Sequence, residues 1–134
     1  MVAEDSGAYR LTLQLDQAAT ITVGRLGSFA FKAGQYAYIG SAKRALSKRV
    51  ARHQRLAAKK SGKLHWHIDY LMSHPDCHMI KQELFEAGKE CEISAAMARR
   101  RGVTIPVEGF GATDCRAGCK THLYKLPERK MATE

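Results

Sequence analysis

The sequence predicts a single α+β domain, in which helices pack on a small and mainly antiparallel β-sheet. Short stretches of alternating apolar and polar residues, typical of half-buried strands, fill the N-terminal part of the chain and recur later. Longer stretches rich in helix-forming residues separate them. With 134 residues the chain has the size of one domain, and we expect its core over about residues 7–127 and a loose tail over 128–134.

The N-terminal part of the chain is predicted to form strands. Residues 8–15 alternate between apolar and polar side chains, and we expect them to form a hairpin with residues 19–23 through the turn "DQA". Residues 28–31 predict another short strand. After a turn at "AG", the next strand is predicted to stop at Gly40.

Three helices and two further strands complete the expected order. The first helix should begin at Ser41 as N-cap and end near Ala58, before the turn "KKSGK". "HWHIDYLMSH" predicts a second helix that ends at the following proline, and "KECEISAAMARRR" a third that ends at a glycine. "CHMIKQELF" predicts a strand between them, and residues 122–126 a short last strand.

The charge of the chain favours a polyanionic partner. Lys and Arg total 22 against 13 Asp and Glu, so the formal net charge is +9, and nucleic acid is the partner we expect. A generally basic surface without such a partner is the alternative. No stretch approaches the ~20 apolar residues of a membrane span, and the acidic N-terminus lacks the apolar segment of a signal peptide. We therefore expect a cytoplasmic protein with no membrane partner.

The first predicted helix has a solvated face and a seam beside its apolar stripe. Arg49 and His53 lie one turn apart on that seam. A guanidinium there needs an anionic partner. That partner is either the carboxylate of Asp69 or Glu92, in a salt bridge, or a scissile phosphate. The spacing does not decide between a salt bridge and a phosphate. The opposite, solvated face would follow a phosphate backbone with Arg44, Lys48, Arg52, Arg55 and Lys59.

An ordered set of motifs gives the chain a family resemblance. "GAY" at 7–9, "YIG" at 38–40, and Arg49 with His53 on the next helix resemble the GIY-YIG nuclease superfamily. "GRLGSFAFKAGQYAYIGSA", "HWHIDYL", "ECE", "GFGATDC" and "HLY" resemble a branch of it known as domain of unknown function 123. Together these motifs cover about residues 7–127.

This resemblance implies a fold and an activity. The fold would be a central three-stranded antiparallel sheet flanked by helices. The two motif tyrosines are 38 − 9 = 29 residues apart, which suggests an inserted hairpin between them. The activity would be endonucleolytic hydrolysis of DNA with Mg²⁺ or Mn²⁺, and RNA is not excluded as substrate. A non-catalytic basic module that binds nucleic acid on the same fold is the second hypothesis.

The resemblance also assigns catalytic roles to two tyrosines, an arginine and a histidine. Tyr9 would act as the general base or relay to it, and Tyr38 would orient the water or contact the phosphate. Arg49 would donate to a non-bridging oxygen, and positive charge from Arg49 and His53 would help a tyrosine with a usual pKa near 10 to react. By spacing, Lys48 could replace Arg49, but it belongs to the solvated face.

Two glutamates compete for the metal in the implied site. The surroundings of Glu92 resemble the family position, so Glu92 is the expected ligand. Glu90 is the rival, because two residues on one helix differ by about 200° and only one can face the site. Tyr36 shares a face with Tyr38, and its role stays open.

The last cysteines and one histidine have the ligand types of a zinc site. They are Cys115, Cys119 and His122, and Cys77 or His78 could supply a fourth ligand. Their spacing is not a common zinc pattern, so reduced thiols in a loop are the preferred interpretation.

Overall fold

The computed structural model describes residues 5–60, 62–112 and 119–127 and has the predicted α+β, mainly antiparallel architecture. Its main sheet has the strand order β5-β1-β4-β6, so it contains four strands where we predicted three. The predicted tail and Cys115 lie outside the described residues. The strands are β1 (Gly7–Leu15), β2 (Ala19–Val23), β3 (Gly27–Phe31), β4 (Gly34–Ala42), β5 (Cys77–Phe85) and β6 (Leu123–Lys125). The helices are α1 (Leu46–Lys59), α2 (His67–Met72) and α3 (Glu90–Ala98), with a short 3₁₀ turn over Gly24–Leu26.

Strand pairing differs from the prediction at the N-terminus. β1 pairs with β4 and β5 and not with β2, so the predicted hairpin between residues 8–15 and 19–23 is wrong. β2 instead pairs with β3 in a separate two-stranded sheet, which confirms a hairpin between the two tyrosines. The physical reason is that both edges of β1 are used by nine-residue strands whose register buries the whole alternate set of leucines.

The connection into α1 also differs. β4 runs to Ala42 and not to Gly40, because its pairing with β1 continues. α1 begins at Leu46, so Ser41 is a strand residue and not the N-cap. Asp5 caps the helix instead, because its carboxylate accepts a first-turn backbone N–H at 3.1 Å. Within the described residues, no helix combines the length and the apolar character needed to cross a bilayer.

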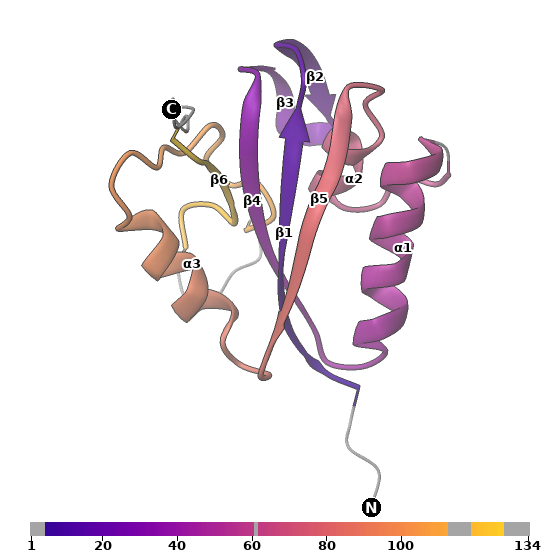
Figure 1. The fold of residues 1–134 in the computed structure, drawn as a ribbon, viewed down its shortest axis with the longest axis vertical. Helices are drawn as coiled ribbons and strands as arrows, with labels where there is room; N and C mark the ends of the chain where they lie inside the picture. Colours follow the sequence, from indigo (N-terminus) through magenta and orange to yellow (C-terminus); the bar gives the residue numbers. More distant parts are fainter. Residues whose placement is uncertain (1–4, 61, 113–118, 128–134) are drawn as a thin grey trace, which may run out of the picture.

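The two faces of the sheet carry different layers (Figure 1). α1 and α2 contact the face on which Tyr9, Leu11 and Tyr38 are buried. α3 packs against β4 from the other side, where Ile39 forms a small cluster with Met97. Because side chains alternate along a strand, Tyr36 and Tyr38 of β4 lie on the face that α1 covers, while Ala37 and Ile39 lie on the face that α3 covers.

Candidate active site

Tyr9 and Tyr38 lie on neighbouring strands and face the same side of the sheet. In the register of β1 and β4, Leu11 is opposite Tyr38 and Gly40 is opposite Tyr9, so the tyrosines are diagonal neighbours. Their ring centroids are 6.3 Å apart, with the planes tilted by 56°. Both side chains are almost covered, with exposed fractions of 2% and 6%. The fold thus brings the tyrosines of the two motifs side by side.

Tyr9 is the first member of a chain of polar groups that runs into the core. Its hydroxyl is 2.9 Å from Nε2 of His53, whose ring is fully buried. Nδ1 of His53 lies 3.9 Å from Oδ1 of Asp69 and has no hydrogen-bond partner among the described residues. We assign the neutral tautomer with the proton on Nδ1, facing the carboxylate, so that the Tyr9 hydroxyl donates to Nε2.

The pKa values in this chain of groups are set mainly by burial. Burial lowers the pKa of His53 to about 4; the Asp69 carboxylate opposes the change, and the charges of Arg52 and Arg49 add to it. Burial also raises the pKa of Tyr9, opposed by the charge and hydrogen bond of Arg49. The neutral forms of both side chains are therefore present at pH 7.

Asp69, which connects α2 to α1, is a fully buried carboxylate with several donors. The Arg52 guanidinium donates to its two oxygens at 3.0 Å each. The backbone N–H groups of His65 and Trp66 donate to Oδ2 at 2.7 and 2.9 Å, which closes the start of α2. The placement of Arg52 on the freely solvated face was therefore wrong: this side chain neutralises a buried anion.

Arg49 is half-buried beside the tyrosines, as the helical spacing predicts. It donates a hydrogen bond of 2.6 Å to the carbonyl of Ser41, and its guanidinium lies over the ring of Trp66, 4.7 Å from the centroid. Among the described residues, no carboxylate forms an ion pair with it. Neither suggested salt bridge is present, because Asp69 pairs with Arg52 and Glu92 pairs with Lys89.

The expected metal ligand, Glu92, is exposed to solvent on α3. Its carboxylate is 73% exposed and lies 3.7 Å from Lys89. The carboxylate of Glu90 is 27% exposed, and its charge raises the pKa of both Tyr9 and Tyr38. The charge of Glu90, and not that of Glu92, thus acts on the tyrosines, so Glu90 is the better placed of the two glutamates.

A cleft adjoins this arrangement at the end of the sheet. It has a volume of about 390 Å³ and is lined in part by Ser41, Lys43 and Glu90. Ser41 is the residue whose carbonyl holds Arg49. The cleft thus makes Glu90, and the Ser41 segment that binds Arg49, accessible to solvent.

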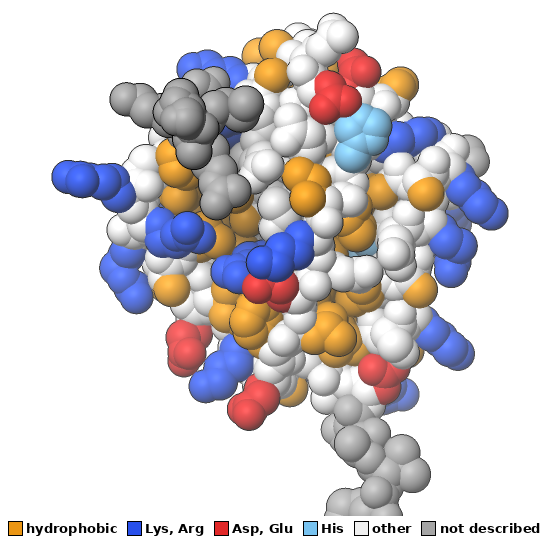
Figure 2. All heavy atoms as spheres, in the orientation of Figure 1, with side chains coloured by type: hydrophobic (Ala, Val, Ile, Leu, Met, Phe, Trp, Pro, Cys, Tyr) orange, Lys and Arg blue, Asp and Glu red, His pale blue; other side chains and the backbone are white. Residues whose placement is uncertain are grey.

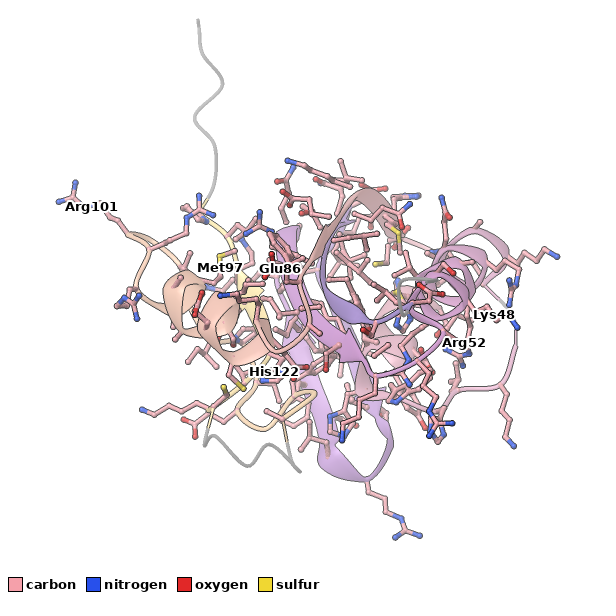
Figure 3. The ribbon with its side chains drawn as sticks, turned by 90° about the horizontal axis from the view of Figure 1, so that it is seen from below. Lys48, Arg52, Glu86, Met97, Arg101 and His122 are labelled. Atoms are coloured by element: carbon pink, nitrogen blue, oxygen red, sulfur yellow. The ribbon has the colours of Figure 1, made fainter. Side chains whose placement is uncertain are left out.

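The remaining predicted phosphate-binding residues are solvent-exposed. Arg44, Lys48, Arg55 and Lys59 lie on or just before α1, and Lys48 and Arg52 are labelled on that side in Figure 3. A second basic group, at the end of α3, was not predicted and comprises residues 99–101. Figure 2 shows Lys and Arg side chains on both of these sides of the molecule.

Tyr36 has a structural environment. Its hydroxyl donates a hydrogen bond of 2.6 Å to the carbonyl of Lys32, on the turn that precedes β4. Burial raises the pKa of Tyr36 to about 12. It lies outside the group formed by Tyr9, His53 and Arg49, although it shares a strand face with Tyr38.

The thiol and imidazole groups of Cys91, Cys119 and His122 gather on the α3 side. Their ligand atoms all lie within 4.8 Å of one another. Cys77 and His78 are not part of this cluster: His78 pairs with Asp16 at 2.6 Å, on another part of the sheet.

Sequence reasoning missed two roles in the site, Asp69 as the partner of Arg52 and Trp66 beneath the two arginines. Asp69 had a signal, because an acidic residue in the first helical turn can cap backbone N–H groups. Trp66 had none, since its contacts with Arg49 and Arg52 join segments more than ten residues apart.

The comparison with known proteins gives one family. The family described as "Domain of unknown function DUF123" matches residues 8–134, which is nearly the whole chain. No curated protein and no solved structure matches the chain significantly. The matched range includes both tyrosines, Arg49, His53 and the Cys/His cluster. The chain therefore belongs to the DUF123 family.

Proposed function

We propose that this chain is a divalent-metal-dependent endonuclease of the GIY-YIG type that hydrolyses phosphodiester bonds in DNA. The observation that supports it most directly is the hydrogen bond between Tyr9 and the neutral, buried His53. Beside that pair lies Arg49, which has no carboxylate partner among the described residues. A proton acceptor and a guanidinium available to a phosphate are two groups that this hydrolysis needs.

Tyr9 relays a proton in the proposed reaction. As a water oxygen attacks phosphorus, a water proton passes to the Tyr9 hydroxyl, which passes its own proton to Nε2 of His53. The histidine becomes cationic 3.9 Å from Asp69, whose charge stabilises it. The bond from phosphorus to the leaving oxygen breaks, and that oxygen takes a proton from solvent. Because the pKa of Tyr9 is raised, its hydroxyl is protonated before the reaction, so it relays a proton and does not act as a phenolate base.

Arg49 stabilises the charge that develops on the phosphoryl group. One of its N–H groups is held by the Ser41 carbonyl and its plane lies over Trp66, so the guanidinium has a fixed direction. The donors that contact neither Ser41 nor Tyr9 remain for phosphate oxygens. A preorganised cation in a partly dehydrated site stabilises a transition state more than the same cation in water does.

Tyr38 positions the attacking water. Its ring packs edge-on against Phe110, with centroids 6.2 Å apart, and a Cβ at Gly111 would lie only 2.8 Å from it. These contacts hold the ring in one orientation. Its raised pKa, caused first by burial and then by nearby negative charge, keeps the hydroxyl protonated and able to donate or accept a hydrogen bond.

Glu90 fits the role of the carboxylate ligand for Mg²⁺ or Mn²⁺. Mg²⁺ keeps most of its waters and binds through one or two carboxylates together with substrate phosphates. Glu90 offers one partly exposed carboxylate at a cleft large enough for a hydrated ion. When bound, the ion would neutralise charge on the phosphoryl and leaving oxygens.

The proposal is tested with plasmid DNA, end-labelled single-stranded DNA and RNA of the same sequence. We expect cleavage with Mg²⁺ or Mn²⁺ that stops when a chelator is added. Arg49→Ala should cleave about 10²-fold more slowly, while Arg25→Ala, at an exposed position to which no binding role is assigned, should retain the rate. DNA retardation without cleavage under every metal condition would replace the nuclease with the basic binding module, and preferential RNA cleavage would change the substrate.

A further inference from the structure

We propose that Cys91, Cys119 and His122 form a zinc site at the junction of α3 and β6. This inference does not depend on the nuclease activity proposed above. It rests on the convergence of three ligand atoms, one from each residue, within 4.8 Å of one another. The residues come from two segments that are distant in sequence, because Cys91 lies on α3 and the other two precede β6.

The distances suit a tetrahedral ion. Zinc binds thiolate sulfur at about 2.3 Å and imidazole nitrogen at about 2.0 Å, so two ligand atoms of a tetrahedral site are about 3.5–3.8 Å apart. The cluster needs only a small contraction from its present spread to reach that geometry. Two thiolates with an imidazole form a soft ligand set that favours zinc over Mg²⁺ or Ca²⁺. The same cluster therefore cannot serve as the Mg²⁺ site that Glu90 would provide.

The surroundings of His122 match those of a metal-bound histidine. The ring is buried, with 2% of its surface exposed, and Nδ1 lies 3.5 Å from Oε2 of Glu90. Metal-binding histidines commonly have a carboxylate at the nitrogen that does not bind the metal, which fixes ring and tautomer. This leaves Nε2 for zinc. In Figure 3, His122 lies on the side of the sheet where α3 packs.

The position of Cys91 leaves its thiol accessible to an ion. Cys91 is the second residue of α3, at the start of the helix, and is only partly buried. Cys77 provides a contrast inside the same chain. It is buried on β5, and burial raises the pKa of its thiol to about 11. The two environments predict different metal affinity for the two cysteines.

Zinc at this site would join the start of α3 to the segment before β6. Glu90 directly precedes Cys91, and the carbonyl of His122 accepts the backbone N–H of Ile39, one residue after Tyr38. The ion would therefore hold the Glu90 carboxylate at a fixed place relative to the tyrosine pair.

The test uses the full chain, freed of metal by a chelator under reducing conditions and then titrated with Co²⁺. We expect one Co²⁺ per chain with a thiolate-to-metal charge-transfer band and the intense visible bands of tetrahedral cobalt, and displacement by Zn²⁺. Cys91→Ala, Cys119→Ala and His122→Ala should each weaken binding by about 10²-fold or more. Cys77→Ala is the matched control, a cysteine outside the cluster, and should bind as the parent does.

A second measurement avoids variants that fail to fold. In the parent chain, Zn²⁺ should slow alkylation of Cys91 and Cys119, mapped by peptide mass, and leave Cys77 unchanged. The proposal is overturned by cobalt spectra without a charge-transfer band, by equal alkylation of Cys91 and Cys119 with and without Zn²⁺, or by zinc binding that the Cys77→Ala change weakens as much as the cluster changes do.

Discussion

Gly40 and Tyr9 face each other across β1 and β4, and the phenol ring of Tyr9 occupies the space where any other residue at position 40 would have its side chain. A Cβ built at Gly40 would lie 2.7 Å from Cε2 of Tyr9 and closer still to its hydroxyl. The backbone of Gly40 has no left-handed conformation, so the requirement for glycine is steric. This glycine allows the Tyr9 hydroxyl to reach His53 over the surface of β4.

The first prediction concerns that contact. Gly40→Ala should displace the Tyr9 ring, lower the free energy of unfolding by about 1–3 kcal/mol, and reduce any cleavage, because the hydroxyl leaves His53. Urea denaturation and the cleavage assay measure both effects. In a Tyr9→Ala background the same change should cost almost nothing. An equal loss of unfolding free energy in both backgrounds would mean that the new methyl group clashes with a residue other than Tyr9.

The second prediction separates the two site tyrosines from a structural one. Tyr9→Phe and Tyr38→Phe should each lower the cleavage rate by about 10²-fold, the scale expected when one positioned acid–base or orienting group is removed. Their combination should cost less than the product of the single losses. Tyr36→Phe is the matched control: it loses the bond to Lys32 but should cleave at the parent rate. If all three variants cleaved at the same rate as the parent, Tyr9 and Tyr38 would have only a packing role.

The third prediction tests the phase of α3. Glu90→Gln should lower metal-dependent cleavage by about 10²-fold or more, while DNA binding and the melting temperature stay close to those of the parent. Glu92→Gln changes an exposed carboxylate paired with Lys89 and should have little effect. Retention of cleavage by Glu90→Gln and its loss in Glu92→Gln would show that Glu92 holds the metal.

The fourth prediction compares two arginines of α1. Arg52→Ala leaves the buried Asp69 without its main partner and should destabilise the fold by about 2 kcal/mol or more. Arg55→Ala, at an exposed position of the same helix, should change stability by less than about 0.5 kcal/mol. It should instead reduce the salt dependence of DNA binding by about one unit if its side chain meets a phosphate. Denaturation curves and binding at several salt concentrations distinguish these outcomes, and equal stability of both variants would contradict the role of Arg52.

The fifth prediction concerns His53 and pH. Its pKa is about 4 in the fold and 6.5 in the unfolded chain, so the unfolded chain binds more protons between these values. The resulting stability is complete above about pH 6.5 and is lost as the pH falls towards 4, by about 3 kcal/mol for this side chain. Denaturation from pH 7.5 to 4 should therefore show a smaller slope for His53→Gln than for the parent. Identical slopes would mean that the pKa of His53 is the same in the folded and unfolded chains.

Local sequence patterns determined most elements of this protein before any contact was known. Alternating apolar residues predicted β1, because the period of two is a property of the strand alone. β5 forms over the nine residues predicted for it from their β-branched and large apolar side chains. Helical spacing likewise placed Arg49 and His53 on one seam of α1. The order of the motifs was enough to single out both tyrosines.

Only the tertiary structure decided which strands pair, which glutamate faces the tyrosines, and which arginine is neutralised inside. The pairing of β1 with β4 and β5 depends on the leucine face that the whole core buries. The rotation of α3 about its axis decides which of Glu90 and Glu92 faces the tyrosines. Arg52 reaches Asp69 because α1 packs beside α2. These relationships join residues that are distant along the chain, and their energies come from burial and charge in a shared interior, which a local sequence period does not specify.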